Sequence, residues 1–558
     1  MIIIAAAVLS RRTGIAAPLL LLALGVGASY VPGMPEIHVE PELILAGVLP
    51  PLLYASAVRM PVVDFRRNFG MISWLSVGLV VTSAVIIGFV VHWVFPQIPL
   101  ALGIALGAVL SPTDAVAATA IGKRLGLPPR LMTVLEGESL VNDASALVVL
   151  RAALGVVTLG TFSLADTVAA FVWAVLAAVL VGWGVGAVTV LLRERLGDPV
   201  LNTTISFAVP FLAYFPAEEL GASGVLAVVV AGVFTGHVGM RRFSAQDRHS
   251  EATNWATVNF LLESGVFLAM GLQVPGLLAQ ARSESGVGNL WLLVGLLVGL
   301  LVVLRFAGVA VALLVPRQGR AARTERVETW VEEVGQRLDA VDPVTETQEI
   351  RLDRLRRRLA RTSADAAFAR REPITRQGGL VLAWAGMRGV VTLAAAQTIP
   401  HGTEHRATLV LAAFLVAVIT LVGFGGTLPA LIRRVGFTVR PLGRRNAELS
   451  QLMTELGERT VESVGPLSDL RIDGDPLDPE LVEWISRRFI PLLMGASAEL
   501  KKRKPDSWEK SLIVQRRYLA AMQDALWAER SIGAYSSATY AAAQALLDRE
   551  ERRMNPMG

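Results

Sequence analysis

The sequence predicts an all-α polytopic membrane protein with about thirteen transmembrane helices. Of its 558 residues, 53% are hydrophobic, and apolar runs recur from end to end. Each run is about 20 residues long, enough for a helix to cross a bilayer. The mean hydropathy is +0.53, far above that of soluble globular domains. The runs lack the strict alternation of polar and apolar residues that membrane β-strands need, so we expect helices.

Charge balance and cysteine content exclude several classes of function. Basic residues number 52 and acidic residues 47, so basic cytoplasmic loops explain the pI of about 9.7 and no nucleic-acid partner is needed. The chain has no cysteine, which removes disulfides, thiolate metal sites and cysteine nucleophiles. The motifs His-Glu-x-x-His and Gly-x-Ser-x-Gly are also absent, so we expect neither enzyme activity nor a cofactor.

The distribution of arginine and lysine predicts the orientation of the chain. The hydrophobic segments lie near residues 1–10, 14–31, 41–58, 69–95, 98–122, 131–156, 164–192, 199–216, 219–239, 253–279, 288–315, 377–400 and 406–435. With the N-terminus outside, most basic residues between segments fall in loops on the inside. We therefore expect a multi-pass protein of the cell membrane with a cytoplasmic C-terminus.

Two charged, helical regions interrupt and follow the membrane domain. The expected divisions are residues 1–316 for the first part of the membrane domain, 317–376 for a cytoplasmic insert, 377–436 for the last two membrane helices and 437–558 for a regulatory tail. Apolar residues in the tail recur at helical spacing, at Val514, Tyr518, Met522 and Leu526.

The sixth segment carries ionisable residues at membrane depth. Counted from Arg130 at about 1.5 Å per residue, Asp143 lies about 20 Å along the helix, close to the middle of the bilayer. Ser139 is one turn earlier on the same face, whereas Asn142 lies about 100° round the helix and Glu138 points well away. Ionisable side chains at this depth are costly and usually face a cavity. This arrangement predicts an ion and proton site at Asp143.

The fifth segment contains Ser111-Pro112-Thr113-Asp114. A proline in the middle of a span removes a backbone donor and breaks the helix. Ser-Pro is also a helix-start signature, with Ser111 as the N-cap and Pro112 at the first position. We therefore expect a discontinuous helix whose second half begins there, with Asp114 facing its positive end.

The twelfth segment has a matching irregularity between Ala385 and Thr392, where glycines flank Arg388. We expect a second broken helix, with Arg388 offsetting negative helix ends. Paired broken helices in corresponding halves are typical of transporters built from an inverted repeat, with the substrate site where the two helices cross.

Two of these motifs resemble the signatures of a known family. Residues 111–121 and 136–147 are similar to the two signature motifs of bacterial sodium/proton exchangers, in the Asn-Asp branch of the monovalent cation/proton antiporter superfamily. The resemblance covers residues 14–436, and further similar segments follow in the family's order at 260–273, 386–396 and 426–434. It implies a homodimer whose six-helix core moves as an elevator.

The resemblance also implies roles for individual residues. Asp143 would bind the cation or the proton, and Ser139 and Thr113 would supply oxygen ligands to Na+, Thr113 through its side chain or its backbone. Asp114 would compensate helix ends near the site, and Asn142 would be the marker of the branch.

Glu138 is implied to form a buried, structural ion pair with an arginine on a later helix. Arg305 is the first candidate and Arg388 the second.

The third segment departs from the family pattern. Many relatives carry an acidic residue after a Leu-Pro-Pro-Leu-Leu-aromatic run, whereas here the run continues from Tyr54 into Ala55 and Ser56. Glu263, in the tenth segment, is either a compensating group on the ion path or the ordinary acid of its own segment.

These observations favour a secondary-active Na+ (or Li+)/H+ antiporter that contributes to pH homeostasis. One exchangeable carboxylate beside Asn142 predicts electroneutral one-for-one exchange, and the absence of lysine between Lys123 and Lys501 agrees with it. A K+/H+ antiporter of the same fold remains an alternative. A cation channel is a second alternative, since broken helices can also line pores.

Overall fold

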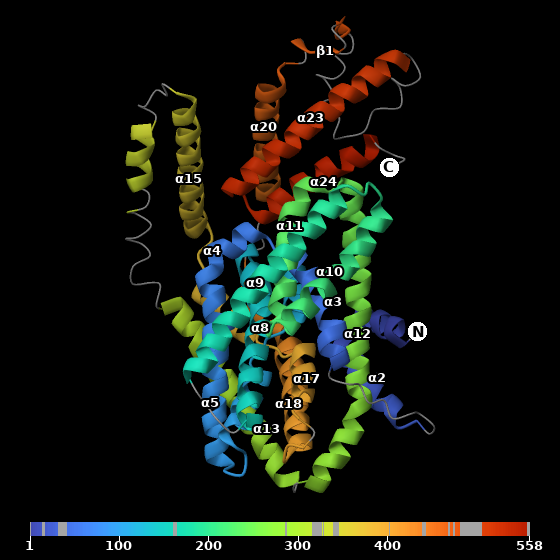
Figure 1. The fold of residues 1–558 in the computed structure, drawn as a ribbon, viewed down its shortest axis with the longest axis vertical. Helices are drawn as coiled ribbons and strands as arrows, with labels where there is room; N and C mark the ends of the chain where they lie inside the picture. Colours follow the sequence, from blue (N-terminus) through green and yellow to red (C-terminus); the bar gives the residue numbers. More distant parts are fainter. Residues whose placement is uncertain are drawn as a thin grey trace. The chain divides into compact units, whose positions relative to one another are not determined.

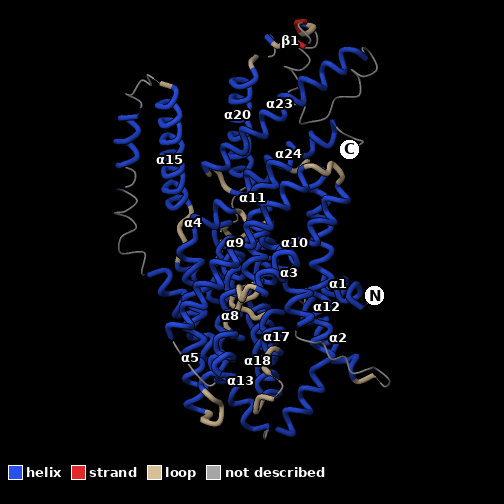
Figure 2. Tube along the Cα trace, in the orientation of Figure 1, coloured by secondary structure: helices blue, strands red, loops and turns tan. Residues whose placement is uncertain are grey.

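The computed structural model describes most of the chain, and every structural statement below concerns those residues. They are residues 2–13, 17–31, 42–159, 164–284, 287–314, 326, 329–338, 345–400, 402–437, 442–466, 469–472, 475–479, 482 and 505–554. Parts of the expected insert (317–325, 327–328 and 339–344) and of the expected tail lie outside them. Helices dominate the described chain, and strands occur only in one short hairpin (Figure 2).

The chain divides into two compact units, each described here by itself. Unit 1 comprises residues 1–239, 251–319 and 374–439, and unit 2 comprises residues 240–250, 320–373 and 440–558. The elements assigned mainly to unit 1 are α1 (Ile2–Thr13), α2 (Ala17–Ser29), η1 (Leu43–Val48), α3 (Leu49–Val58), α4 (Val62–Ser73), η2 (Trp74–Gly78), α5 (Leu79–Val94), α6 (Leu100–Leu110), α7 (Ala115–Leu125), α8 (Pro129–Leu159), α9 (Leu164–Glu194), α10 (Pro199–Glu219), α11 (Gly224–Arg242), α12 (Ala245–Glu284), α13 (Val287–Leu314), α16 (Arg376–Trp384), α17 (Val390–Gln397), α18 (Arg406–Thr420), η3 (Leu421–Gly425) and α19 (Gly426–Val435) (Figure 1).

Unit 1 has the helix lengths of a membrane protein. Among the described residues, 8 helical stretches are long and apolar enough to cross a bilayer, and three shorter apolar helical stretches accompany them. The expectation of a mostly helical, multi-pass membrane protein is confirmed. The count of thirteen spans stays a prediction.

The fifth hydrophobic segment is broken. Helix α6 ends at Leu110 and α7 begins only at Ala115, because Pro112 cannot donate a backbone hydrogen bond. The Ser111 hydroxyl donates to the carbonyl oxygen of Gly107 at 2.7 Å, back into the helix that is ending. The expected role of Ser111 as N-cap of the second half is therefore wrong, since Ser111 terminates the first half.

The twelfth segment is broken in the same way, between α16 and α17. Helix α16 ends at Trp384, and Gly389, in an extended conformation with φ −129° and ψ −153°, immediately precedes α17. Helices α17 and α18 both contact α6, and Figure 1 shows α17 and α18 side by side. Both broken helices thus belong to one packed cluster.

Small residues hold α6 close to α5. A Cβ placed on Gly107 would lie 2.6 Å from the carbonyl oxygen of Ala84, and one on Gly103 would lie 2.9 Å from that of Gly88. Glycine at these positions lets the two backbones touch, which is typical of helix packing in membranes. This packing fixes where the break after α6 lies.

Unit 2 is a helical unit with its own core. Its elements are α15 (Glu346–Arg371), α20 (Leu442–Val464), β1 (Arg471–Ile472), β2 (Asp475–Pro476), α23 (Pro505–Ile532) and α24 (Ser537–Met554). Helices α20, α23 and α24 contact one another around Leu456, Leu526 and Leu547, which are buried. The tail residues that recur at helical spacing are all buried on α23, at Val514, Tyr518, Met522 and Leu526.

Residues 240–250 belong to unit 2 and form the link, which comprises the end of α11, residues 243–244 and the start of α12. Arg248 of this link forms an ion pair with Asp548 of α24, and the backbone N–H of Ala245 donates to Glu551 at 3.0 Å. Arg241 forms a third, more exposed pair with Asp524 at 3.2 Å. The link is therefore held by the tail through several charged contacts.

Candidate functional site

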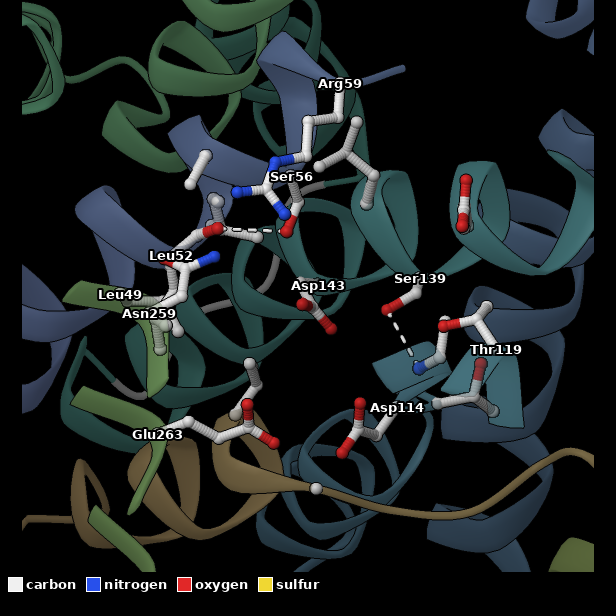
Figure 3. Close-up of a pocket in the computed structure, with 18 of the residues that line it drawn as sticks. Leu49, Leu52, Ser56, Arg59, Asp114, Thr119, Ser139, Asp143, Asn259 and Glu263 are labelled. Atoms are coloured by element: carbon white, nitrogen blue, oxygen red, sulfur yellow. Dashed lines mark hydrogen bonds between the residues drawn. The ribbon is translucent and has the colours of Figure 1, made fainter. Parts of the chain in front are cut away.

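A cavity of about 470 Å³ lies within unit 1. Its walls come from α3, α7, α8, α12, α17 and the breaks that precede α7 and α17. Three carboxylates point into it, from Asp114, Asp143 and Glu263 (Figure 3). Both broken helices and the sixth segment therefore contribute to one space.

Asp143 lies on α8 and is 6% exposed. Within the described part of the chain, its carboxylate has neither a hydrogen-bond partner nor a cationic partner. A buried, unpaired carboxylate is costly while it is charged. The group therefore favours a bound proton or a bound cation.

Ser139 lies one turn before Asp143 and lines the same cavity. Its Oγ accepts a hydrogen bond of 3.3 Å from the backbone N–H of Ala115, the first residue of α7. This bond satisfies one of the unpaired N–H groups at the start of that helix. A hydroxyl oxygen has two lone pairs, so one acceptor position remains for a ligand.

Asp114 lies where the two broken helices meet. Its backbone N–H donates a hydrogen bond of 2.7 Å to the carbonyl oxygen of Met387 in the other break. Its side chain packs on Gly389, where an added Cβ would lie 2.6 Å from the Asp114 Cβ. The carboxylate stands just before α7, where the helix dipole favours negative charge.

Behind the cavity, Glu138 is 1% exposed and pairs with Arg305. The contact is bidentate, with the second bond from Nη2 to Oε2 at 2.9 Å, and the same Nη2 donates to the carbonyl oxygen of Leu382. Of the two arginines considered from the sequence, the structure pairs Glu138 with Arg305. Glu138 faces away from the cavity that Asp143 lines, as the helical spacing predicts.

The hydroxyl of Thr113 belongs to this buried network. It donates to Glu138 Oε1 at 3.0 Å and accepts from the side-chain amide of Asn142 at 2.9 Å. Asn142 is 1% exposed, and its Oδ1 has no hydrogen-bond partner among the described residues. The side chains of Thr113 and Asn142 therefore support Glu138, while Ser139 and Asp143 face the cavity.

Arg388 caps the first broken helix. Its Nε donates to the carbonyl oxygen of Leu110, the last residue of α6, at 2.8 Å, and its Nη1 donates to that of Gly386. A guanidinium is favourable at the negative C-terminal end of a helix.

The cationic side chains that line the cavity are already engaged. Lys123 is 3.0 Å from Glu136, and Arg59 donates to the carbonyl oxygen of Ala252 at 3.3 Å. The third-segment wall presents Ser56, whose hydroxyl donates back to Leu52, and no acid.

Sequence reasoning missed two polar residues of the cavity whose oxygens lack partners in the described structure. Thr392, on α17, is fully buried and lines the cavity, and its hydroxyl has no partner in the described structure. Asn259, on α12, also lines the cavity, and its Oδ1 has no partner there either. Only their positions in the sequence could have indicated them, since Asn259 is one helical turn before Glu263 and Thr392 follows the glycine-rich break.

Comparison with known families decides the identity of the chain. A model described as "Sodium/hydrogen exchanger, transmembrane" matches residues 1–434. The chain belongs to the sodium/hydrogen exchanger family. Members of this family are ion transporters rather than enzymes.

Named relatives of this chain occur in several bacteria. An uncharacterised Na+/H+ exchanger of Escherichia coli is 37% identical over 289 residues, covering 50% of this chain and 52% of the relative. A sodium, potassium, lithium and rubidium/H+ antiporter of Bacillus subtilis is 33% identical over 281 residues, covering 49% and 42%. These matches span about half of each relative's length or less. An uncharacterised Na+/H+ exchanger of Mycobacterium tuberculosis is 28% identical over 536 residues, covering 93% and 88%.

A solved structure has a similar fold. The sodium proton antiporter of Methanocaldococcus jannaschii, determined at pH 8, matches with a TM-score of 0.54 and 16% identity, over 78% of this chain and 97% of that one.

Proposed function

We propose that this exchanger is a secondary-active Na+ (or Li+)/H+ antiporter in which Asp143 binds either the cation or the proton. The observation that carries the proposal is the Asp143 carboxylate, buried, lining a cavity and without a protein partner among the described residues. The neighbouring carboxylate of Glu138 differs from that of Asp143, because Arg305 forms an ion pair with it and neutralises its charge.

In this mechanism, the proton and the cation compete for the single carboxylate of Asp143. A proton on Asp143 excludes the cation, and loss of the proton leaves a carboxylate that attracts it. Charge is expensive in the membrane, so only the neutralised site, protonated or loaded with cation, crosses readily. Exchange is then one cation for one proton, and electroneutral, because Asn142 adds no charge beside Asp143.

Oxygen atoms around Asp143 complete the cation site. Ser139 supplies its hydroxyl oxygen, which still has a free lone pair, and water supplies further ligands. Thr113 contributes through its backbone, because its hydroxyl is committed to Glu138 and Asn142. Asp114 tunes the site through its charge at the start of α7. No cofactor is part of this mechanism.

The wider architecture follows from the two broken helices. Their interruptions touch through Asp114 and Met387, which supports an inverted repeat of about thirteen helices with the site at the crossing. The exchanger works by alternating access in a homodimer, with a core that moves as an elevator. It lies in the cell membrane with its N-terminus outside and its C-terminus in the cytoplasm.

The tail regulates transport through the link at residues 240–250. The link connects α11 to α12, and α12 carries two cavity residues, Asn259 and Glu263. The ion pair between Arg248 and Asp548 ties this link to α24. Movement of the tail is thereby transmitted to one wall of the cavity.

K+ is the second candidate cation. It is favoured by the printed activity of the Bacillus subtilis relative, which includes potassium, and by the absence of an acid in the third-segment wall. Fewer charged oxygens around the ion weaken discrimination in favour of the smaller cation.

Transport in proteoliposomes tests the proposal. Vesicles holding pyranine and a pH gradient receive Na+, Li+ or choline, with and without valinomycin in symmetric K+ to clamp the potential, and K+ is tested separately without valinomycin. We expect a cation-specific pH change inside that the clamp leaves unchanged. Current without coupled proton movement would instead indicate the channel alternative.

A further inference from the structure

We propose that Glu263 and Asn259 form a second cation-binding position on the α12 wall of the cavity. There a partly hydrated monovalent cation is held on its way to or from Asp143. The inference rests on the proposed antiport and adds a site to it.

The first argument is geometric. Asn259 and Glu263 are four residues apart on α12, so their side chains share one helix face, and both line the cavity. Figure 3 shows the Glu263 carboxylate pointing into the space that the Asp143 carboxylate also enters, from a different helix. An ion that moves between the two walls passes between these carboxylates.

The second argument concerns unsatisfied oxygens. Glu263 is partly buried and has no ion-pair partner among the described residues, and Asn259 Oδ1 is buried without a hydrogen-bond partner there. Buried acceptors without donors are costly, and a cation with its water relieves that cost. Two further groups that line the cavity show the same deficit, the Asp143 carboxylate on α8, which is 6% exposed, and the fully buried hydroxyl of Thr392 on α17.

The third argument separates the two positions. Within the described residues, no three acidic or histidine side chains converge closely enough to hold one metal ion. The cavity of about 470 Å³ leaves room for water between its walls. In the proposed arrangement, water fills the space between Glu263 on α12 and Asp143 on α8, so that Glu263 holds a hydrated cation at its own position.

The remaining cavity acid provides a matched comparison. Glu136 also lines the cavity, but Lys123 lies 3.0 Å from its carboxylate and neutralises it. A role that required only a negative charge near the cavity would be shared by Glu136. A cation position requires an acid without a cationic partner, and on this criterion Glu263 qualifies and Glu136 does not.

Cation binding to the purified full-length protein tests the proposal without transport. Equilibrium binding of radioactive Na+ is measured for Asp143→Asn alone and combined with Glu263→Gln or Glu136→Gln. We expect weak residual binding to Asp143→Asn, loss of it in the Glu263→Gln combination, and its retention in the Glu136→Gln combination. Absence of residual binding, or equal residual binding in all three variants, would overturn the second position.

Transport kinetics give an independent readout. For Glu263→Gln we expect the KM for Na+ to rise roughly tenfold or more, the effect of losing one charged contact, with Vmax largely retained. Glu263→Asp should restore part of the affinity, and Asn259→Ala should have a smaller effect. An unchanged KM would exclude Glu263 from cation binding, and a loss of Vmax accompanied by a lower melting temperature would assign it a structural role. If the wild-type protein shows no exchange, the proposed antiport fails, while the binding experiment still decides the second position.

Discussion

The backbone N–H of Asp114 donates a hydrogen bond of 2.7 Å to the carbonyl oxygen of Met387. The two residues lie in the interruptions of two different broken helices, so one bond joins the irregular parts of both. Unpaired backbone groups are tolerated at membrane depth only when they are buried in protein or line a cavity. Here each interruption supplies a partner for the other beside the cavity.

This contact depends on glycine at position 389. We expect Gly389→Ala to reduce exchange strongly, because an added Cβ would lie 2.6 Å from the Asp114 Cβ and would force the two interruptions apart. The measurement is initial exchange rate in proteoliposomes at matched protein content. Gly426→Ala is the control, since an added Cβ there meets nothing within 4 Å. Equal rates for both variants would show that the close packing is dispensable.

We propose that the ion pair between Glu138 and Arg305 is structural. Removing one partner of a buried pair leaves an unpaired charge, so Arg305→Met should cost about 3–5 kcal/mol of stability. Thermal unfolding of the detergent-purified protein measures this as a lower melting temperature. The double variant with Glu138→Gln should recover part of the loss, because no buried charge then remains unpaired. If Arg305→Met alone is as stable as the wild-type protein, the ion pair does not stabilise the fold.

The tail holds the link between α11 and α12 mainly through Arg248. The pair it forms with Asp548 is largely buried, at 16% and 17% side-chain exposure, so Asp548→Arg should loosen the link and change the exchange rate. Protection of residues 240–250 from hydrogen exchange reports the loosening. The double variant Asp548→Arg with Arg248→Asp should restore this protection, because the two charges are exchanged.

Asp524→Asn is the matched control for that experiment. Its partner Arg241 lies in the same link, but the pair is exposed, at 57% and 66%, and exposed pairs contribute only about 0–1 kcal/mol. Little change in protection is expected. A larger effect for Asp524→Asn than for Asp548→Arg would contradict the assignment.

The tail should become less stable as pH rises. Burial raises the pKa of Glu529 above its ordinary value of 4.5, Arg459 lowers it by less, and Glu455 raises it further. A carboxyl whose pKa is raised by folding stabilises most below its ordinary pKa, and this contribution is lost as pH rises through the folded-state value. Hydrogen exchange in α23, corrected for intrinsic rates, should therefore show falling protection above about pH 4.5.

Glu529→Gln keeps the shape of the side chain and cannot ionise. It should flatten this pH dependence and leave α23 better protected than in the wild type at neutral pH. The same slope in both proteins would show that another group is responsible.

The sequence predicted those features that depend on local chemistry. Pro112 and the glycines around Arg388 indicate breaks because a missing donor and missing side chains disrupt a helix wherever they occur. Helical spacing likewise placed Glu138 away from Asp143. Ser111 was misassigned because Ser-Pro favours a helix start locally, whereas Ser139, distant in sequence, accepts the N–H at the start of α7.

Other features could not be predicted because they depend on the tertiary fold. The hydroxyl of Thr113 faces Glu138 only because α7 and α8 pack together. Arg248 and Asp548 are 300 residues apart, and nothing in either neighbourhood indicates the other. Asn259 and Thr392 have no distinctive motif, and only the cavity shows that their oxygens lack partners.

The most direct test of the central claim is exchange by Asp143→Asn. Asparagine has nearly the same size as aspartate but cannot bind a proton or carry the charge that attracts a cation. Proton movement driven by Na+, Li+ and K+ is measured in proteoliposomes beside the wild-type protein, with melting temperature as the check on folding. We predict a folded protein that has lost coupled exchange of every cation. Exchange by Asp143→Asn at the wild-type rate would contradict the account.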